Sequence, residues 1–293
     1  MKFLIIGASG FIGRHILAYA KSLGYEVLGT ASRPQPAEGL LGLDLVRDRL
    51  VEKVPASFFQ TGGPVFVIIS AAISQIDRCY RERDVTCAVN VANTMRLMEE
   101  AAVLGARPVY LTSSFVFDGR VGYYTESDPH SPISEYGRQK ADIESECRQR
   151  HADWLLVRLD KIVGDDPAED HLFSEWYRWS QARHQIVCMA NQVFSPTCVD
   201  DIARAIILGC QKGLTGLYNV SNSEYFTRDE LARQFFRILG GEASIICKTQ
   251  QELGFVDLRP EKSYLDGGRF VQATGLRFMA MRQVISRFKE KIG

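Results

Sequence analysis

The sequence predicts an α/β protein built on a Rossmann-like, doubly wound parallel sheet, with a smaller C-terminal α/β domain that binds substrate. Two observations carry this prediction. Short apolar runs alternate with helical periodicity over residues 1–160, and the first run leads directly into a glycine-rich turn. Strands that alternate with helices require right-handed crossovers, which make the strands parallel and place helices on both faces of the sheet.

The expected strands of the first half are continuous apolar runs, which are typical of strands buried on both faces. An apolar-periodic helix follows the first strand from Phe11 to Leu23, and Gly24 stands where its C-terminus would be. We expect the strands at 2–6, 25–31, 65–69, 108–112 and 154–159, and further helices at about 82–104 and 135–150.

The regular alternation of strand and helix patterns ends after residue 160. Thr227 and Glu230 form a capping-box pattern that predicts the start of a helix. Helices are expected at 171–183 (rich in aromatic residues), 199–212, 227–239 and 280–291. We therefore predict a dinucleotide-binding domain of residues 1–163, to which 196–215 return, and a smaller substrate-binding domain of residues 164–195 and 216–293.

Composition restricts the partners. The 35 basic residues balance 35 acidic ones, so no electrostatic attraction to nucleic acid or to an anionic membrane is expected. No stretch approaches the roughly 20 apolar residues of a membrane span. The seven cysteines form no C-x-x-C pair and the five histidines are dispersed, which favours free thiols in a reducing cytoplasm and no metal site.

The turn after the first strand reads G-x-x-G-x-x-G and opens a helix, as a pyrophosphate-binding turn does. Gly7 would make the tight turn, Gly10 would let the backbone approach a pyrophosphate, and Gly13 would let the helix pack close to the sheet. The cofactor-binding residues expected in this segment are Gly7, Ser9, Gly10, Phe11, Ile12 and Gly13.

The end of the strand at 25–31 indicates which nicotinamide cofactor binds. An acidic residue there would hold the ribose 2′-hydroxyl of NAD, but this chain has Ser32 and Arg33. Both could bind a 2′-phosphate through charge-assisted hydrogen bonds, so NADPH is expected over NADH. The alternative is that Arg33 is a solvated loop residue.

Three side chains form the expected catalytic group. Tyr136 and Lys140 lie four residues apart on one helix face, and Ser113 follows the strand at 108–112, at the carboxyl end of the sheet. A neighbouring ammonium would lower the pKa of the phenol and let Tyr136 exchange a proton with a carbonyl or alcohol oxygen. The alternative for such a pair is surface packing.

Motifs in the same order along nearly the whole chain resemble the extended short-chain dehydrogenase/reductase superfamily, and within it the dTDP-4-dehydrorhamnose reductase-like group. They are GASGFIG (7–13), LDL (43–45), SAA (70–72), VNVANT (89–94), LTSSFVFDG (111–119), YGRQK (136–140), FSPTCVDDIA (194–203) and RPEKSYLD (259–266).

The resemblance implies further roles. Asp44 and Leu45 would flank the adenine, Ala71 and Ala72 would line the cofactor, and Lys140 would also hold the nicotinamide ribose. Asn90 is as well explained by packing or helix capping as by a role beside the cofactor.

The chain departs from the group near the substrate. Ser114 and Phe115 stand where the group has an acidic residue and a tyrosine, and the segment after Gly164 does not resemble the group's substrate segment. Candidate substrate-binding residues are Ser113, Ser114 and Arg259, although Arg259 could instead form a structural salt bridge. The aromatic helix could stack on a sugar, but such helices more often form core.

These features together predict a cytoplasmic NADPH-dependent oxidoreductase that reduces a keto group of a sugar, nucleotide-linked as in the group it resembles. A small-molecule sugar or nucleotide-sugar is the expected partner, and a homodimer is one assembly open to it. Two alternatives remain: an NAD(P)-dependent nucleotide-sugar epimerase on the same scaffold, and a non-catalytic cofactor-binding regulatory subunit.

Overall fold

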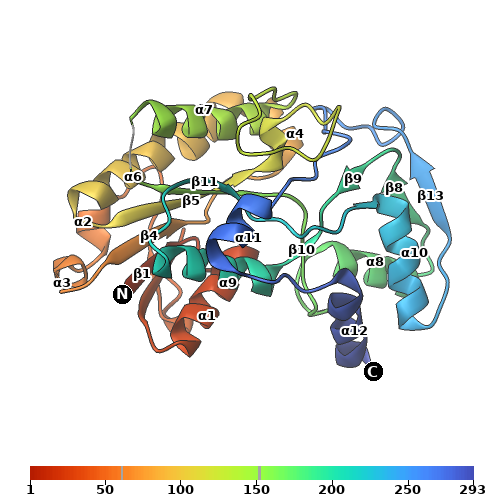
Figure 1. Cartoon of the computed structure of the whole chain (residues 1–293), viewed down its shortest axis with the longest axis horizontal. Coiled ribbons are helices and arrows are strands. Elements are labelled where there is room, and N and C mark those ends of the chain that lie inside the picture. Colours follow the sequence, from red (N-terminus) through yellow and green to blue (C-terminus); the bar gives the residue numbers. More distant parts are fainter. Residues whose placement is uncertain (61, 151–152) are drawn as a thin grey trace.

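A computed structural model describes residues 1–60, 62–150 and 153–293, and it has two lobes of unequal size (Figure 1). The larger lobe is a seven-stranded parallel sheet with helices on both faces, which confirms the expected fold class. No helix within these residues has the length and apolar character needed to cross a membrane.

The strand order β11-β6-β5-β4-β1-β2-β3 reverses between β1 and β4, which is where doubly wound sheets bind their ligands. All five residues of β4 are buried because helices cover both sides of the sheet, and this explains the continuous apolar sequence. The strands are β1 (Lys2–Ile6), β2 (Glu26–Ala31), β3 (Leu40–Gly42), β4 (Val65–Ile69), β5 (Arg107–Ser113), β6 (Leu155–Leu159) and β11 (Gly216–Asn219).

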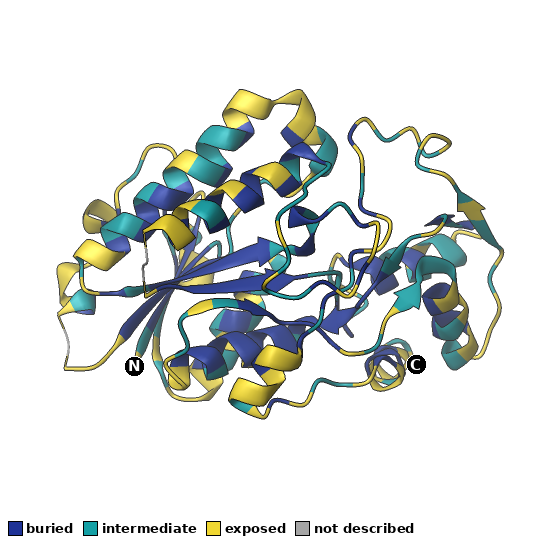
Figure 2. Ribbon diagram, turned by 45° about the horizontal axis from the view of Figure 1, so that its top comes forward, coloured by how far each residue is buried: buried dark blue, intermediate teal, exposed yellow. Residues whose placement is uncertain are grey.

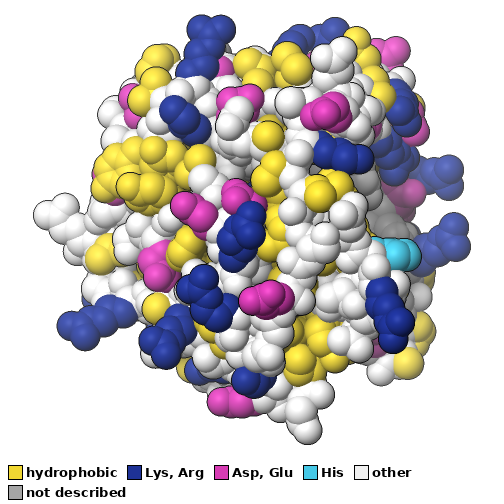
Figure 3. Space-filling view, turned by 90° about the vertical axis from the view of Figure 1, so that its right-hand side faces the viewer, with side chains coloured by type: hydrophobic (Ala, Val, Ile, Leu, Met, Phe, Trp, Pro, Cys, Tyr) yellow, Lys and Arg dark blue, Asp and Glu magenta, His cyan; other side chains and the backbone are white. Residues whose placement is uncertain are grey.

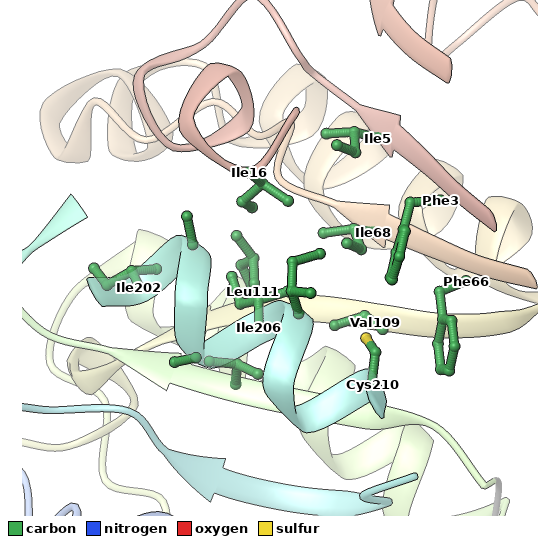
Figure 4. Packing of buried hydrophobic residues seen from close by; sticks show 14 of the residues in the cluster. Phe3, Ile5, Ile16, Phe66, Ile68, Val109, Leu111, Ile202, Ile206 and Cys210 are labelled. Atoms are coloured by element: carbon green, nitrogen blue, oxygen red, sulfur yellow. The ribbon is translucent and has the colours of Figure 1, made fainter. Parts of the chain in front are cut away.

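One face of the sheet packs against α1 (Phe11–Ser22), α9 (Val199–Gln211) and α11 (Gly268–Thr274). Figure 4 shows Ile202 and Ile206 of α9 lying over strand residues such as Val109 and Leu111. The opposite face packs against helices of the first half of the chain, whose apolar sides are buried and whose outer sides are exposed (Figure 2). Those helices are α2 (Leu50–Lys53), α3 (Ala56–Phe59), α6 (Thr94–Val103) and α7 (Glu135–Gln149).

The smaller lobe has its own apolar core, in which Phe173, Trp176, Phe235 and Phe288 are fully buried. It contains α8 (Leu172–Gln181), β8 (Ile186–Met189), α10 (Arg228–Leu239), β13 (Ile245–Lys248) and α12 (Met281–Ile292). The face that this lobe presents in Figure 3 carries interspersed basic and acidic side chains, in keeping with the balanced composition.

The remaining elements are short. They are η1 (Pro36–Glu38), α4 (Ile76–Arg81), α5 (Arg83–Cys87), the π-helical segment η2 (Ala88–Asn93), η3 (Ser114–Val116), β7 (Ile162–Val163), β9 (Val193–Phe194), β10 (Thr197–Cys198) and β12 (Phe226–Thr227). The sequence predicted one helix at 82–104, and the structure divides that stretch into α5, η2 and α6.

The structure also differs from the expected grouping of segments. Strand β11 pairs in parallel with β6 at the edge of the large sheet, and Phe270 of α11 lies in the large lobe's core. The sequence had placed 216–293 as a whole in the smaller domain. A four-residue edge strand with only two buried positions has too little apolar periodicity to reveal its sheet.

Candidate active site

The glycine turn has the geometry that its sequence predicts. Gly7 has a φ of +89°, and a Cβ there would lie 2.8 Å from the backbone nitrogen of Ala71. A Cβ on Gly13 would collide with the Gly7 carbonyl, so glycine at this position allows α1 to start directly against the turn. Gly10 precedes the first residue of α1, and no side chain caps the helix there. The N–H groups at this end are therefore available to an anion.

The neighbours of the turn lie at the same sheet edge. Ser9 is exposed, Ile12 lines a cavity beside the turn, and the ring of Phe11 stacks on His171 of the smaller lobe at 5.6 Å between centroids. Phe11 therefore links the turn to the second lobe, a contact that the sequence did not reveal.

The residues expected at the adenine end follow successive strands. Ser32 and Arg33 are exposed directly after β2, and Asp44 and Leu45 are half-buried after β3. The Asp44 carboxylate accepts hydrogen bonds from the N–H groups of Val46 and Arg47 and so fixes its own loop.

Ala71 and Ala72 follow β4, where Ala71 is half-buried against Gly7 and Ala72 lines the cavity beside the turn. Asn90 is buried behind this segment. Its amide accepts from the N–H of Ile73 at 2.8 Å and donates to the carbonyl of Ile73 at 2.9 Å and to Gln139 at 2.8 Å. Asn90 therefore holds the loop after β4 against α7.

The catalytic candidates meet because α7 packs closely on the end of β5. Ser134 caps α7 by accepting a hydrogen bond from the N–H of Gly137 at 3.1 Å. A Cβ on Gly137 would collide with the Phe115 carbonyl, so this glycine lets the helix approach the turn after Ser113. Ser113, Tyr136 and Lys140 consequently line one cavity of about 150 Å³.

The pKa of Tyr136 is opposite to the expectation. Burial raises it to about 12, and a hydrogen bond with Ser113 offsets only part of that rise. The expected lowering by Lys140 is wrong because Nζ lies 5.7 Å from the centre of the phenol ring and bonds elsewhere. Tyr136 is therefore a neutral phenol, able to donate a proton, throughout the physiological pH range.

Two hydrogen bonds within the protein fix the position of the Lys140 ammonium. Its Nζ donates to the Tyr110 hydroxyl at 2.9 Å and to the Leu111 carbonyl at 2.8 Å, which leaves one ammonium proton for a ligand. Burial lowers the pKa of Lys140 to about 8, although the nearby Glu144 carboxylate opposes this shift.

A buried ion pair anchors α7 beneath the site. Arg158 of β6 and Glu144 of α7 are almost fully buried, and the guanidinium donates to both carboxylate oxygens. His130 and Thr112 also hydrogen-bond to Glu144. Burial opposes ionisation of Glu144, but the bonds from His130 and Arg158 keep its pKa below the ordinary value. Arg158 lies within the strand expected at 154–159, but the sequence does not reveal that Glu144 is its partner.

A second cavity of about 390 Å³ adjoins the first, and Ser113 and Asp160 line both. Ser114 is buried and donates to Asp160 at 2.8 Å, while Ser263 donates to the same carboxylate oxygen at 2.7 Å. The Asp160 carboxylate thus joins the end of β5 to the late RP-x-x-S motif. Burial raises its pKa even though these groups donate to it.

Arg259 lines the second cavity and also forms a salt bridge, so both of its expected roles are compatible with its position. Its guanidinium donates to Asp77 at 2.8 Å and stacks on Phe255. Of the aromatic helix, Phe173 and Trp176 are core residues, and Trp179 faces the cavity.

The sequence did not single out Asp160, Lys161, Glu175 or Arg228, which also line the second cavity. Two of them come directly after β6, and strand ends at this sheet edge are the signal that could have identified them. Within residues 1–60, 62–150 and 153–293, no group of three or more His, Cys, Asp or Glu side chains is arranged to hold a metal ion.

Comparisons with known proteins agree with this architecture. The family model described as "RmlD substrate binding domain" matches residues 1–292. The spore coat polysaccharide biosynthesis protein SpsK of Bacillus subtilis (strain 168) is 25% identical over 291 residues, which are 99% of this chain and 97% of SpsK. The methionine adenosyltransferase 2 subunit beta of Xenopus laevis is 28% identical over 242 residues, covering 79% of this chain and 70% of the relative.

Among solved structures, dTDP-4-dehydrorhamnose reductase from Bacillus anthracis str. Ames in complex with NADP superposes with a TM-score of 0.85. It is 23% identical, and 98% of each chain is covered. This likeness independently supports the fold.

Proposed function

Because the chain belongs to the family of the RmlD substrate binding domain, we propose that it is an NADPH-dependent reductase of a keto group on a nucleotide-linked sugar. One observation carries the proposal: Ser113, Tyr136 and Lys140 converge on a cavity at the same sheet edge as the open glycine turn. The complex of a structurally similar reductase with NADP supports the choice of cofactor.

The residues present fit such a cofactor. The uncapped start of α1 and the glycines that bring it against the sheet suit a pyrophosphate, while Ser32 and Arg33 suit a 2′-phosphate. Asp44 and Leu45 would flank the adenine, and Ala71 and Ala72 would line the cofactor. Lys140 would hold the nicotinamide ribose. When bound, NADPH supplies the hydride for the carbonyl carbon.

Side chains of this protein protonate the oxygen of that carbonyl and hold it in position. The neutral Tyr136 phenol donates its proton to the oxygen as negative charge develops there, and solvent later restores it. Ser113 hydrogen-bonds the same oxygen and keeps it next to Tyr136. The Lys140 ammonium, fixed by Tyr110 and Leu111, contributes positive charge without moving.

The test is the Tyr136→Phe variant, assayed by loss of NADPH absorbance with a panel of nucleotide-linked keto sugars. Removing the proton donor should lower turnover by about 10²- to 10⁴-fold. NADPH affinity should stay within about twofold of wild type, because the phenol oxygen is not among the groups assigned to the phosphates. Full activity of this variant would end the proposal. Isomer formation without stoichiometric loss of NADPH would favour an epimerase.

The similarity to a methionine adenosyltransferase beta subunit favours one second candidate, a cofactor-binding regulatory subunit without turnover. In that case NADPH would bind, and the whole panel would remain unreduced while the protein co-purified with an enzyme. Ser113, Tyr136 and Lys140 are all present and line one cavity, which supports a catalytic function.

A further inference from the structure

The second cavity contains two cations from different parts of the chain. Lys161 follows β6 directly beside Asp160, and Arg228 is the first residue of α10. Both side chains line the cavity together with apolar residues of the smaller lobe, among them Val187, Met189 and Phe194. The two cations therefore face the substrate side of the active site from opposite lobes.

Neither cation has an ion-pair partner in the part of the chain that the structure describes. No carboxylate there lies within 4.0 Å of Lys161 Nζ or of the Arg228 guanidinium, and Lys161 Nζ donates no hydrogen bond to those residues. Arg228 has one neutral acceptor, the Gln192 side chain at 3.2 Å. Glu175 lines the same cavity but lies beyond ion-pair distance of both cations.

Two other charged residues of the cavity, Arg259 and Asp160, have partners within the protein. Arg259 pairs with Asp77 at 2.8 Å, and Asp160 accepts from Ser114, Ser263 and the N–H of Ser195. A protein normally pairs a charge that it takes out of water, because an unpaired buried charge is costly. Two cations that have no carboxylate within 4.0 Å among the described residues, beside an apolar wall, thus indicate that the missing negative charge belongs to a ligand.

We propose that Lys161 and Arg228 form an oxyanion-binding subsite that holds a phosphate or carboxylate of the substrate. This inference rests on the proposed function only in taking the second cavity as the substrate site. It makes the two residues specificity determinants: a neutral sugar of the same shape would leave both cations unpaired. The low polarity of the surrounding wall strengthens their attraction to an anion.

The pKa of Lys161 agrees with this role. Burial lowers it to about 8, and the neighbouring Arg228 charge lowers it further, whereas Glu175 and Asp160 oppose the shift. An anion between the two cations would relieve both effects.

The experiment measures binding of two anionic probes and their neutral counterparts to the full chain by calorimetry at pH 7. The probes are dTDP against thymidine, and glucuronic acid against glucose. Lys161→Gln and Arg228→Gln are compared with Lys212→Gln on the exposed end of α9 and with Arg237→Gln on the exposed side of α10. NADPH binding is measured in the same samples.

At least one anionic probe should bind more tightly than its neutral counterpart, and each cavity variant should weaken that binding by about tenfold or more. The two control variants should leave it unchanged. A loss for dTDP alone identifies a phosphate as the bound group, and a loss for glucuronic acid alone identifies a carboxylate; both support the subsite. Equal affinity for charged and neutral probes, or no effect of the cavity variants, would overturn it.

Thermal unfolding separates this role from a structural one. Neutralising a half-buried cation that has no carboxylate partner removes a cost, so ligand-free Lys161→Gln and Lys161→Met should melt at or above the wild-type temperature. A marked fall for both would contradict the proposal. If the anion subsite behaves as expected but NADPH does not bind, the proposed function fails and the subsite remains.

Discussion

Two charge clusters lie near the carboxyl end of β5, and they are built differently. Beneath the cavity of Tyr136 and Lys140, Arg158 and Glu144 make direct ion-pair contacts, and His130 and Thr112 complete the set. In the second cavity, Lys161 and Arg228 meet no carboxylate within 4.0 Å among the described residues. The first cluster is complete within the protein, whereas the second is incomplete without a ligand.

This difference shows how to distinguish a structural charge from a binding charge in one molecule. Removing a partner from the complete cluster should destabilise the fold, because it leaves an uncompensated charge in the core. Removing a charge from the incomplete cluster should change ligand affinity and leave the free energy of unfolding nearly unchanged. The predictions below test that contrast.

The largest effect is expected for Arg158→Met. It leaves Glu144 ionised and buried with only His130 and Thr112 as partners, so the free energy of unfolding should fall by about 3–5 kcal/mol. Urea unfolding followed by circular dichroism measures this. The matched control is Lys161→Met, for which no fall is expected. Similar losses for both variants would remove the contrast between the clusters.

The second effect is a pH dependence of NADPH affinity. The pKa of Lys140 is lowered to about 8, so the side chain is charged below pH 8 and becomes neutral above it. Affinity should therefore fall by up to about tenfold per pH unit above 8. Fluorescence titration measures it.

Two variants make this pH test specific. Lys140→Met should abolish the dependence, while Lys161→Gln should retain it, because Lys161 faces the substrate cavity. Tyr136, with a pKa of about 12, should add no step below pH 11. A profile unchanged in Lys140→Met would show that another group titrates.

The sequence predicted the strands of the large sheet and the glycine turn well for physical reasons. Strands buried on both faces must be apolar throughout, and the one predicted at 65–69 matches β4 residue for residue. Gly7 and Gly13 cannot be replaced without collision, so the turn that they form leaves a fixed pattern in the sequence.

The charges of the site could not be predicted in the same way. Arg158 lies within an expected strand, but its pairing with Glu144 of α7 is visible only once β6 and α7 are packed together. The pKa of Tyr136 depends on how far the phenol is buried and on where Lys140 Nζ points, and neither follows from a four-residue spacing. Lys161 and Arg228 are 67 positions apart, which leaves no local signal of their meeting.

A smaller effect is expected from Arg33→Ala. Arg33 is exposed after β2, where the proposal places the 2′-phosphate of NADPH. Losing an exposed charge-assisted hydrogen bond should weaken NADPH binding by about tenfold and leave NADH binding unchanged. Arg47→Ala, at an exposed loop position beyond β3, is the control. Equal weakening of NADPH and NADH binding would show that Arg33 does not contact the 2′-phosphate.

The smallest effect concerns the start of α10, the helix that brings Arg228 into the cavity. Thr227 accepts from the N–H of Glu230 at 3.3 Å, and Glu230 accepts from the N–H of Thr227 at 3.0 Å, which confirms the predicted capping box. Thr227→Ala should lower the free energy of unfolding by about 1 kcal/mol, measured by thermal unfolding.

The chain provides a matched control for this cap. Thr249 and Glu252 exchange the same pair of bonds, but they do so in an exposed turn that opens no helix. Thr249→Ala should therefore cost less than Thr227→Ala, because no row of unpaired helical N–H groups depends on it. If the two substitutions cost the same, the stabilisation comes from the local bonds alone. The placement of Arg228 would then rest on the packing of α10 against the smaller lobe's core.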